Sequence, residues 1–313
     1  MYFYYESCGH SPSPIPPTIP INSRSFLFGD HAYEVLRTYR HVPFAAEAHF
    51  ERLLSSLTYL KYDIYPSFDT LCQDLFKILQ YAYHTLHLTD ELCIRYHFGR
   101  SEDNHIGLYP STSLNPLWIY ICAPLEFYRV RHDPKRGLRL GISPVYRHDP
   151  QSFSPNVKTG NYANNMLACI DAKNRGFDDA IFLHGQSRTL LEGSTFNIAF
   201  LDLEGTLVVP DPHTENRYLK GITLASLIDT QPNFSWKFED ISHDKLDKYP
   251  YCLALSTTRE IQWIGAIESH VFKPIPEKFL APLQTHFNKV IQADTEKFKG
   301  LLVRNLETST LQR

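Results

Sequence analysis

The chain has 313 residues, of which 43% are hydrophobic and 21% charged, as in an ordinary soluble, folded protein. Its formal net charge of −3 argues against a nucleic-acid-binding protein, which normally carries a basic face. No apolar run approaches the roughly 18 residues that a membrane-spanning helix needs, and the N-terminus lacks a signal-peptide pattern. We therefore expect a cytoplasmic protein without a membrane or nucleic-acid partner.

The first 124 residues predict a small mixed domain. Residues 25–39 are aromatic and β-branched around Gly29 and Asp30, which predicts a strand, a turn and a second strand. Two amphipathic helices and two strands are predicted next, over 47–63, 68–86, 92–98 and 117–123.

The remaining residues predict a larger domain, 138–313, after a polar and basic interdomain linker at 125–137. A helix over 161–175 is expected to bury Tyr162, Met166 and Ile170. Strands are predicted at 138–146, 179–210 and 251–257, with helices starting near Gly221 and covering 277–294. The fold class is therefore α+β, with two domains.

Six cysteines and fifteen histidines are scattered along the chain. There is no CxxC pair, and no HxxxH or HExxH spacing falls on a helical stretch. We expect reduced, mostly buried thiols and no metal site.

Lys158 and Glu192 stand out because of their positions. Lys158 lies just ahead of the helix predicted over 161–175, and Glu192 lies in a predicted strand with apolar neighbours. A lysine before a helix is usually only solvated, and a strand carboxylate often only blocks edge pairing. Together they meet two demands of pyridoxal phosphate, which needs a lysine for its imine and an acid that keeps its ring nitrogen protonated.

Three other features could hold the cofactor's phosphate. The helix starting at Gly221 offers free N–H groups and its positive dipole end, and Ser256–Thr258 offers hydroxyls after a strand. Arg52 could reach inward as a cation. Each feature also has an ordinary explanation, since Thr223 could merely cap its helix and Arg52 could merely face water.

These pieces, in this order, resemble the class IV aminotransferases, which are fold-type-IV pyridoxal-phosphate enzymes. The matching stretches lie between about Ile19 and Ile267. They are FLFGDHAYEVLRTY, the H-x-x-R-L-x-x-S of His49–Ser56, KTGNY at 158–162, LEGSTFN at 191–197, LKGIT at 219–223 and STTREI at 256–261. The resemblance implies the two-domain architecture of the D-amino-acid aminotransferase type, pyridoxal phosphate as cofactor, and a homodimer.

By this resemblance, Lys158 would form the imine and carry the proton between the substrate Cα and the cofactor C4′. Glu192 would hold the pyridine nitrogen and Tyr162 the ring hydroxyl, while Leu219 would pack on the ring face. The residues implied at the phosphate are Arg52, Gly221, Ile222, Thr223 and Thr257.

For the substrate, Arg95 resembles the carboxylate-side arginine of branched-chain aminotransferases, although Cys93 replaces the usual tyrosine. Tyr33 resembles a substrate-facing aromatic residue of the branched-chain and D-amino-acid members, and Thr258 is predicted as a further substrate residue. The R-x-H carboxylate trap of the D-amino-acid enzymes is not cleanly present, because the SEDNH stretch offers only His105.

Two further positions differ from the family pattern. His31 stands where many relatives have glycine, and Leu224 replaces the arginine that usually follows G-I-T.

The predicted reaction moves an amino group from an amino acid to a 2-oxo acid such as 2-oxoglutarate. Arg95 and the aromatic, uncharged neighbourhood expected around Tyr33 favour an L-branched-chain donor, and a D-amino-acid aminotransferase is the nearest rival. A 4-amino-4-deoxychorismate lyase is a second alternative, disfavoured because many such lyases carry threonine where this chain has Glu34. A cofactor-binding protein without turnover is the third.

Overall fold

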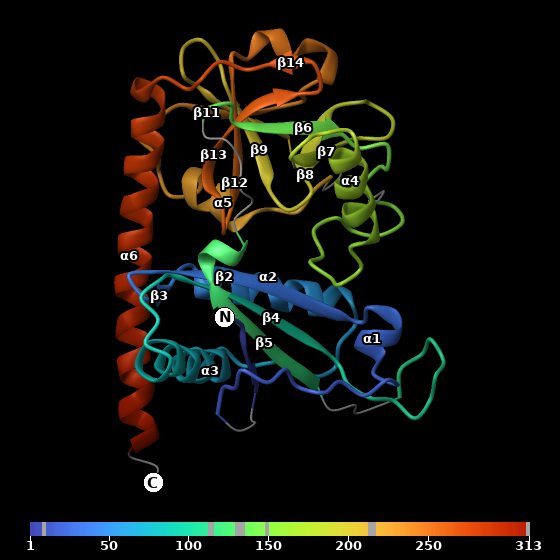
Figure 1. The fold of residues 1–313 in the computed structure, drawn as a ribbon, viewed down its shortest axis with the longest axis vertical. Helices are drawn as coiled ribbons and strands as arrows, with labels where there is room; N and C mark the ends of the chain where they lie inside the picture. The colour runs from blue at the N-terminus through green and yellow to red at the C-terminus, as the bar shows by residue number, and fades with distance from the viewer. Residues whose placement is uncertain (8–10, 112–115, 129–134, 148–149, 212–216, 311–313) are drawn as a thin grey trace. The chain divides into compact units, whose positions relative to one another are not determined.

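The computed structural model describes residues 1–7, 11–111, 116–128, 135–147, 150–211 and 217–310 (Figure 1). The chain divides into two compact units. Unit 1 comprises Met1–Tyr128, Val157–Asn161 and Ile291–Arg313, and unit 2 comprises Arg129–Asn156 and Tyr162–Val290.

The predicted linker at 125–137 falls near the main division of the chain, although its residues 129–134 lie outside the described part. Two later segments do not follow the predicted scheme, because Val157–Asn161 and the end of the chain belong to unit 1. The lysine at 158 therefore lies in a different unit from Glu192. The scheme of two domains and a linker stays a prediction.

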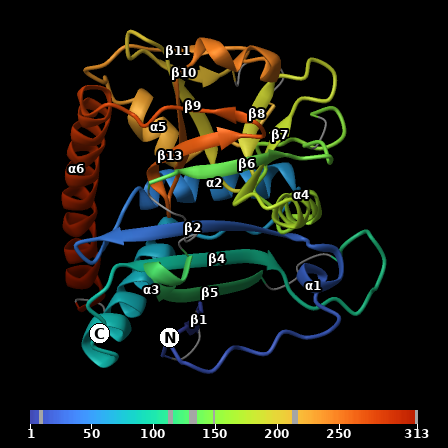
Figure 2. The same ribbon diagram turned by 45° about the horizontal axis from the view of Figure 1, so that its top comes forward.

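Unit 1 contains an antiparallel sheet in the order β1-β5-β4-β2-β3. Figure 2 shows β2, β4 and β5 as neighbouring strands. Tyr33 in β2 lies opposite His97 in β4. The strands are β1 (Phe3–Glu6), β2 (His31–Tyr39), β3 (Val42–Pro43), β4 (Leu92–Arg100) and β5 (Pro116–Pro124).

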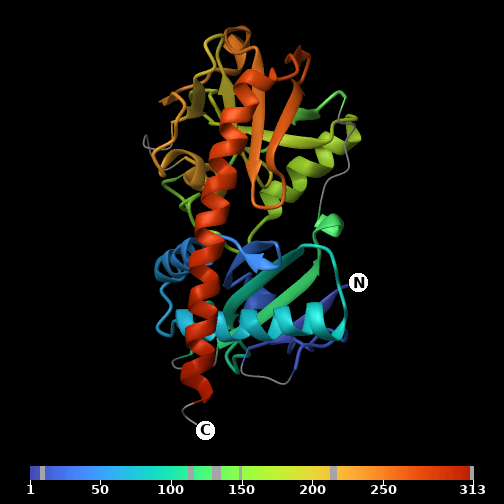
Figure 3. The same ribbon diagram turned by 90° about the vertical axis from the view of Figure 1, so that its left-hand side faces the viewer.

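Helices cover one face of this sheet, and Figure 3 shows α3, in cyan, beside β4 and β5. The predicted apolar face of α2 is confirmed, because Phe50, Leu53 and Leu57 are buried in the unit 1 core. The helices are α1 (Arg24–Phe28), α2 (Ala46–Tyr59), α3 (Phe68–Gln80), a π-helical turn (Tyr81–Thr85) and a 3₁₀ turn (Leu125–Tyr128).

The two faces of the sheet differ because side chains alternate along a strand. Leu36 in β2 and Ile94 in β4 belong to the helix-covered core. Tyr33 and Arg95 are at odd-numbered positions of the same strands, so their side chains lie on the other face. The polar and aromatic side chains of that face form the part of the candidate site that unit 1 contributes.

The strand predicted at the start of the 25–39 stretch is wrong. Arg24–Phe28 forms the short helix α1, which ends at Gly29 with a φ of 63°. Glycine adopts this left-handed conformation without the steric cost that a side chain would add. A helix of five residues is too short to show the apolar repeat by which helices are predicted.

Unit 2 is built on a sheet in the order β11-β10-β9-β12-β13-β6-β7-β8. β8 also pairs with β9, so the strands from β9 through β12, β13, β6 and β7 to β8 form a closed ring. The strands are β6 (Leu138–Ile142), β7 (Asp179–Leu183), β8 (Leu190–Gly193), β9 (Asn197–Leu201), β10 (Leu207–Pro210), β11 (Trp236–Glu239), β12 (Tyr251–Ser256), β13 (Glu260–Ile267) and β14 (His270–Val271).

Three shorter helices accompany this ring: α4 (Ala163–Asn174), α5 (Ile222–Ile228) and a 3₁₀ helix (His243–Lys248). The helix predicted over 277–294 is longer than expected, because α6 covers Glu277–Thr310. The division between the units falls inside α6, after Val290.

The predicted buried face of α4 is wrong. Met166 and Ile170 are about half exposed, at 57% and 49%. The buried face instead carries Asn165, Ala168 and Ala172, and these alanines pack with residues of β7. Small side chains allow the helix to lie close to the strand, so apolar size alone pointed to the wrong face.

Within the described ranges, no helix is long and apolar enough to cross a membrane. The same residues contain no group of three or more His, Cys, Asp or Glu side chains that could hold a metal ion.

Candidate active site

The backbone around Lys158 is fixed to the sheet of unit 1. The Tyr33 N–H donates to the Lys158 carbonyl at 3.0 Å, and the Gly160 N–H donates to the His31 carbonyl at 3.1 Å. On its other side, the Lys158 N–H donates to Ser56 Oγ of α2 at 3.1 Å. The lysine therefore emerges from a segment that adds to the edge of β2, and its backbone has little freedom.

The side chain of Lys158 lies against Tyr33. Its Nζ is 4.5 Å from the centre of the Tyr33 ring, and the guanidinium carbon of Arg95 is 4.0 Å from the same centre. The His97 ring stacks on Tyr33, with 5.4 Å between the ring centres. The surroundings of Tyr33 are therefore cationic as well as aromatic, and the expectation of an uncharged neighbourhood is wrong.

Arg95 has one hydrogen-bond partner in the described part of the chain. Its Nε–H donates to His97 Nε2 at 2.9 Å, and no described carboxylate pairs with the guanidinium. Burial, reinforced by the charge of Arg95, lowers the pKa of His97 to about 3. A neutral imidazole can accept this bond, whereas a protonated one cannot.

His31 completes the cluster on this face. Its ring centre is 5.0 Å from that of His97, and its Nδ1 is a buried atom without a hydrogen-bond partner. A side-chain Cβ at Gly160 would lie 2.1 Å from His31 Cε1, so the glycine leaves room for this imidazole. His31 thus packs directly on the segment that carries Lys158.

Arg52 is paired with a buried glutamate. Its Nε and Nη2 donate to the two carboxylate oxygens of Glu34, both at 2.7 Å, and His49 Nδ1 lies 2.8 Å from the same carboxylate. Burial alone would raise the pKa of Glu34, but Arg52 and His49 outweigh it and hold the pKa at about 2. The pair fixes the direction of the Arg52 guanidinium, whose phosphate contact stays a prediction.

In unit 2, Glu192 lies where β8 and β9 close the ring. It pairs with Asn197 across the two strands, and its side chain is buried. Arg147 Nε donates to Glu192 Oε1 at 2.6 Å, and the Leu219 N–H points to the same oxygen at 3.4 Å. A buried arginine beside a buried carboxylate favours its ionised form.

Arg147 contacts Glu192, and nothing in its sequence context singled it out beforehand. Besides Glu192, its guanidinium donates to Asn165 Oδ1 of α4 at 3.3 Å, while Asn165 Nδ2 donates to the Ser194 carbonyl at 2.6 Å. These bonds tie the carboxylate to α4 and to the turn after β8. The only sequence signal was a basic residue in a proline-containing loop, a common surface feature.

The segment leading into α5 is held next to Glu192. Asn197 Nδ2 donates to the Leu219 carbonyl at 2.9 Å, and a Cβ at Gly221 would lie 1.8 Å from Asn197 Oδ1. Gly221 is also the residue before the first turn of α5, which begins at Ile222 and in which Thr223 is buried. The expected helix start is confirmed, with glycine explained by the close approach of Asn197.

Thr257 and Thr258 lie in the turn between β12 and β13, where both are half-buried. Arg259 anchors this turn, because its Nη2 lies 2.6 Å from Asp179 Oδ2 and both side chains are buried. Ser194 Oγ donates to the other oxygen of Asp179. Tyr162, expected at the cofactor's ring hydroxyl, immediately precedes α4 and is half-buried.

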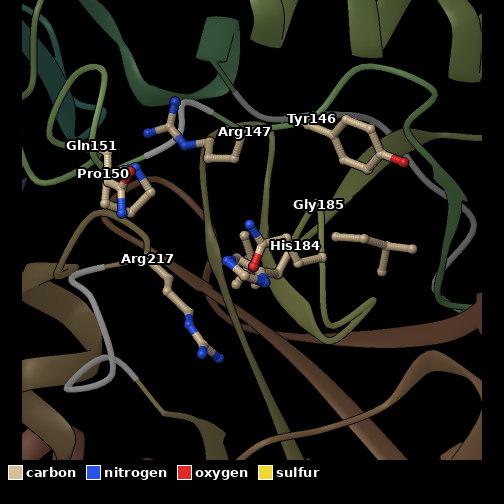
Figure 4. A pocket seen from close by; sticks show the side chains of 10 residues that line it. Tyr146, Arg147, Pro150, Gln151, His184, Gly185 and Arg217 are labelled. Atoms are coloured by element: carbon tan, nitrogen blue, oxygen red, sulfur yellow. The ribbon is translucent and has the colours of Figure 1, made fainter.

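A cavity of about 340 Å³ lies beside the loop that carries Arg147 (Figure 4). Its lining includes Tyr146, Arg147, His184 and Arg217. Leu191 lines it as well, whereas Glu192 and the other residues predicted to hold the cofactor do not. This cavity is therefore separate from the predicted set.

The residues present fit pyridoxal phosphate. Unit 1 offers a lysine on a fixed backbone, and unit 2 offers a buried carboxylate held by an arginine. Gly221 could not be replaced without displacing Asn197, which braces the chain before α5. Short backbone approaches of this kind are typical where a phosphate meets a helix start.

The sequence model of the family described as "Amino-transferase class IV" matches residues 31–267. The chain belongs to the class IV aminotransferases. Enzymes of this family are transaminases that depend on pyridoxal phosphate. The cofactor and the reaction type expected for this class IV aminotransferase are thereby confirmed.

Two curated relatives differ in the substrates that their names give. A D-alanine aminotransferase from Staphylococcus aureus (strain N315) is 26% identical over 292 residues, which cover 91% of this chain and 96% of that protein. A probable branched-chain-amino-acid aminotransferase from Aquifex aeolicus is 28% identical over 222 residues, covering 67% of this chain and 66% of that one.

Among solved structures, the fold is similar to that of a hypothetical aminotransferase from Mycobacterium tuberculosis in its PLP-bound form. The TM-score is 0.79 at 17% identity, covering 93% of this chain and 99% of that chain. The predicted α+β, fold-type-IV architecture of this class IV aminotransferase is confirmed.

Proposed function

We propose that this aminotransferase moves the amino group of an L-branched-chain amino acid to a 2-oxo acid such as 2-oxoglutarate. The observation that carries the proposal is Arg95, a half-buried guanidinium that no described carboxylate neutralises. It shares the ring of Tyr33 with Lys158, so a carboxylate bound by Arg95 would place its substrate close to the lysine amine. Carboxylates are the groups that an arginine fork binds best.

The chemistry follows from the two sets of residues. When bound, pyridoxal phosphate supplies an electron sink for the electron pair that remains on the substrate Cα once its proton is removed. Lys158 would hold the cofactor through its amine and would move the proton at the substrate Cα, so it would serve as nucleophile and as general base. The Glu192 carboxylate would accept a hydrogen bond from the protonated ring nitrogen and keep it protonated, while Arg147 donates to the same carboxylate. In unit 2, the first turn of α5 and Thr257 would hold the phosphate, and Arg52 of unit 1 is the cation that the family resemblance adds.

A D-amino-acid aminotransferase is the second candidate. It is favoured by the similarity to the Staphylococcus aureus D-alanine aminotransferase, which covers nearly the whole of both chains. The cationic surroundings of Tyr33 are also less suited to a purely apolar substrate than the sequence indicated.

The decisive experiment incubates the cofactor-loaded protein with 2-oxoglutarate and either L-leucine or D-alanine, and measures glutamate. Glutamate from L-leucine supports the lead, and glutamate from D-alanine alone replaces it with the second candidate. Pyruvate released from 4-amino-4-deoxychorismate, without glutamate in either other arm, would identify a lyase. Lys158→Ala is expected to abolish turnover and the yellow colour of the cofactor complex.

We also propose that the enzyme is a homodimer, as the family resemblance implies. Large apolar side chains are exposed on one part of unit 1, where Leu108 and Tyr109 are each 81% exposed. The loop that carries them is held in place, because Arg24 donates to the Gly107 and Leu108 carbonyls. Sedimentation equilibrium would measure the mass, and a monomer at working concentration would contradict the proposal.

A further inference from the structure

Arg95 and His97 form a connected pair on β4. They are two positions apart in the strand, so both side chains lie on the sheet face that the helices leave uncovered. The Arg95 Nε–H donates to His97 Nε2 at 2.9 Å, and the guanidinium lies over Tyr33 with 4.0 Å to the ring centre. Tyr33 also stacks on the His97 ring, so both Arg95 and Tyr33 contact His97.

The direction of this hydrogen bond determines the state of His97. Because Nε2 accepts, the imidazole proton must be on Nδ1. The neighbouring Arg95 and His31 disfavour a second proton, and burial lowers the pKa further. His97 thus stays an acceptor at neutral pH.

An arginine held in this way presents a defined pair of donors. A guanidinium on a flexible chain can turn freely, and ordering it on binding costs side-chain entropy. With Nε bonded to His97 and the plane lying over Tyr33, the two terminal nitrogens remain to bind a ligand. Their spacing matches the two oxygens of a carboxylate.

His97 is in turn supported from the Lys158 segment. The His31 ring lies 5.0 Å from the His97 ring and packs on Gly160, two residues after Lys158. Tyr33, which His97 stacks on, donates its backbone N–H to the Lys158 carbonyl. The orientation of Arg95 and the position of the lysine are therefore set by one connected group of side chains.

We propose that His97 is a positioning residue that fixes the Arg95 guanidinium, and so determines how tightly the enzyme binds the carboxylate of its 2-oxo acid substrate. The proposal rests on the proposed aminotransferase function. His97 acts through Arg95 and does not touch the reacting atoms.

The test compares His97→Leu, which removes the acceptor, with His97→Gln, which keeps a side-chain oxygen as acceptor. His97→Leu is expected to raise the KM for 2-oxoglutarate about tenfold, as for one lost charge-assisted hydrogen bond, with kcat changed less than about twofold. His97→Gln is expected to stay within about threefold of the wild type. His84→Leu, at an exposed histidine of the same unit, is the matched control.

A double-mutant cycle separates positioning from a merely structural role. In an Arg95→Ala background, His97→Leu is expected to cause no further rise in KM, because the group it positions is absent. An equal rise in both backgrounds would overturn the proposal, as would a KM for His97→Leu equal to that of the wild type.

The proposal remains testable if the aminotransferase assignment itself fails. Absence of turnover with every amino donor would contradict the proposed function, but it would not contradict the positioning of Arg95 by His97. Calorimetric titration of 2-oxoglutarate into the cofactor-loaded wild type and His97→Leu proteins measures binding without chemistry. Equal dissociation constants would then overturn the role of His97, whereas about tenfold weaker binding by the variant would support it.

Discussion

At the scale of single residues, the site depends on pairs in which one member sustains the charge of the other. Glu192 is buried at the closure of the ring and forms an ion pair with Arg147. Glu34 is buried in unit 1 and keeps its charge beside Arg52. Glu192 and Arg52 could be selected for the site from the sequence, whereas their partners Arg147 and Glu34 could not. Nothing in a single sequence shows which distant charges meet.

Loss of Arg147 tests the pair at Glu192. Arg147→Met is expected to lower the free energy of unfolding of the cofactor-free protein by about 3–5 kcal/mol, because it leaves a buried carboxylate without its arginine. Arg136→Met is the matched control, since Arg136 pairs with Asp178 in the same unit but is 43% exposed. Arg136→Met should lower the free energy of unfolding by no more than about 1 kcal/mol. Urea titrations measure the free energy of unfolding of both variants. Equal losses for Arg147→Met and Arg136→Met would refute the distinction between the buried and the exposed ion pair.

At the scale of elements, the apolar repeat predicted most of the fold. It found the helices over 46–59 and 68–80 and the central strands β4 and β5, because long elements with one buried face carry a clear period. It failed at α1, which is only five residues long, and at α4, where alanines rather than large residues face the core. The pairing of β8 with β9 closes the ring of strands, and no local sequence pattern predicts this pairing.

The contact between His31 and Gly160 gives a prediction at the same scale. Gly160→Ala should displace the His31 ring, because its Cβ would lie 2.1 Å from Cε1, and should lower activity and melting temperature together. The backbone at Gly160 is not in the left-handed region, so the effect is steric, and the three atoms nearest to the added Cβ all belong to the His31 ring.

His31→Ala should therefore rescue Gly160→Ala. The double variant is expected to recover most of the melting temperature that Gly160→Ala loses, which differential scanning fluorimetry would show. Additive losses in the double variant would mean that the alanine disturbs something other than the imidazole.

At the scale of the whole molecule, buried titratable groups of unit 1 link stability to pH. The pKa of Glu34 is about 2, against an ordinary value of 4.5, and that of His97 is about 3, against 6.5. In both cases the unfolded chain takes up a proton at a higher pH than the folded protein does. Stability is therefore greatest above the unfolded pKa values and decreases on acidification.

The two groups act in different pH windows, which allows them to be separated. The wild type should lose stability as the pH falls below about 6.5, because burial lowers the pKa of His97 and also those of His31 and His49, with Glu34 adding to the loss from about 4.5 toward 2. Buried Asp74, whose pKa is raised by burial, opposes this trend in every variant equally. His97→Gln should therefore give a flatter curve between pH 6.5 and 4.5, where Glu34 contributes little. Urea unfolding at half-unit steps of pH measures the slopes, and parallel curves for the two proteins would show that His97 takes up its proton equally in the folded and unfolded states.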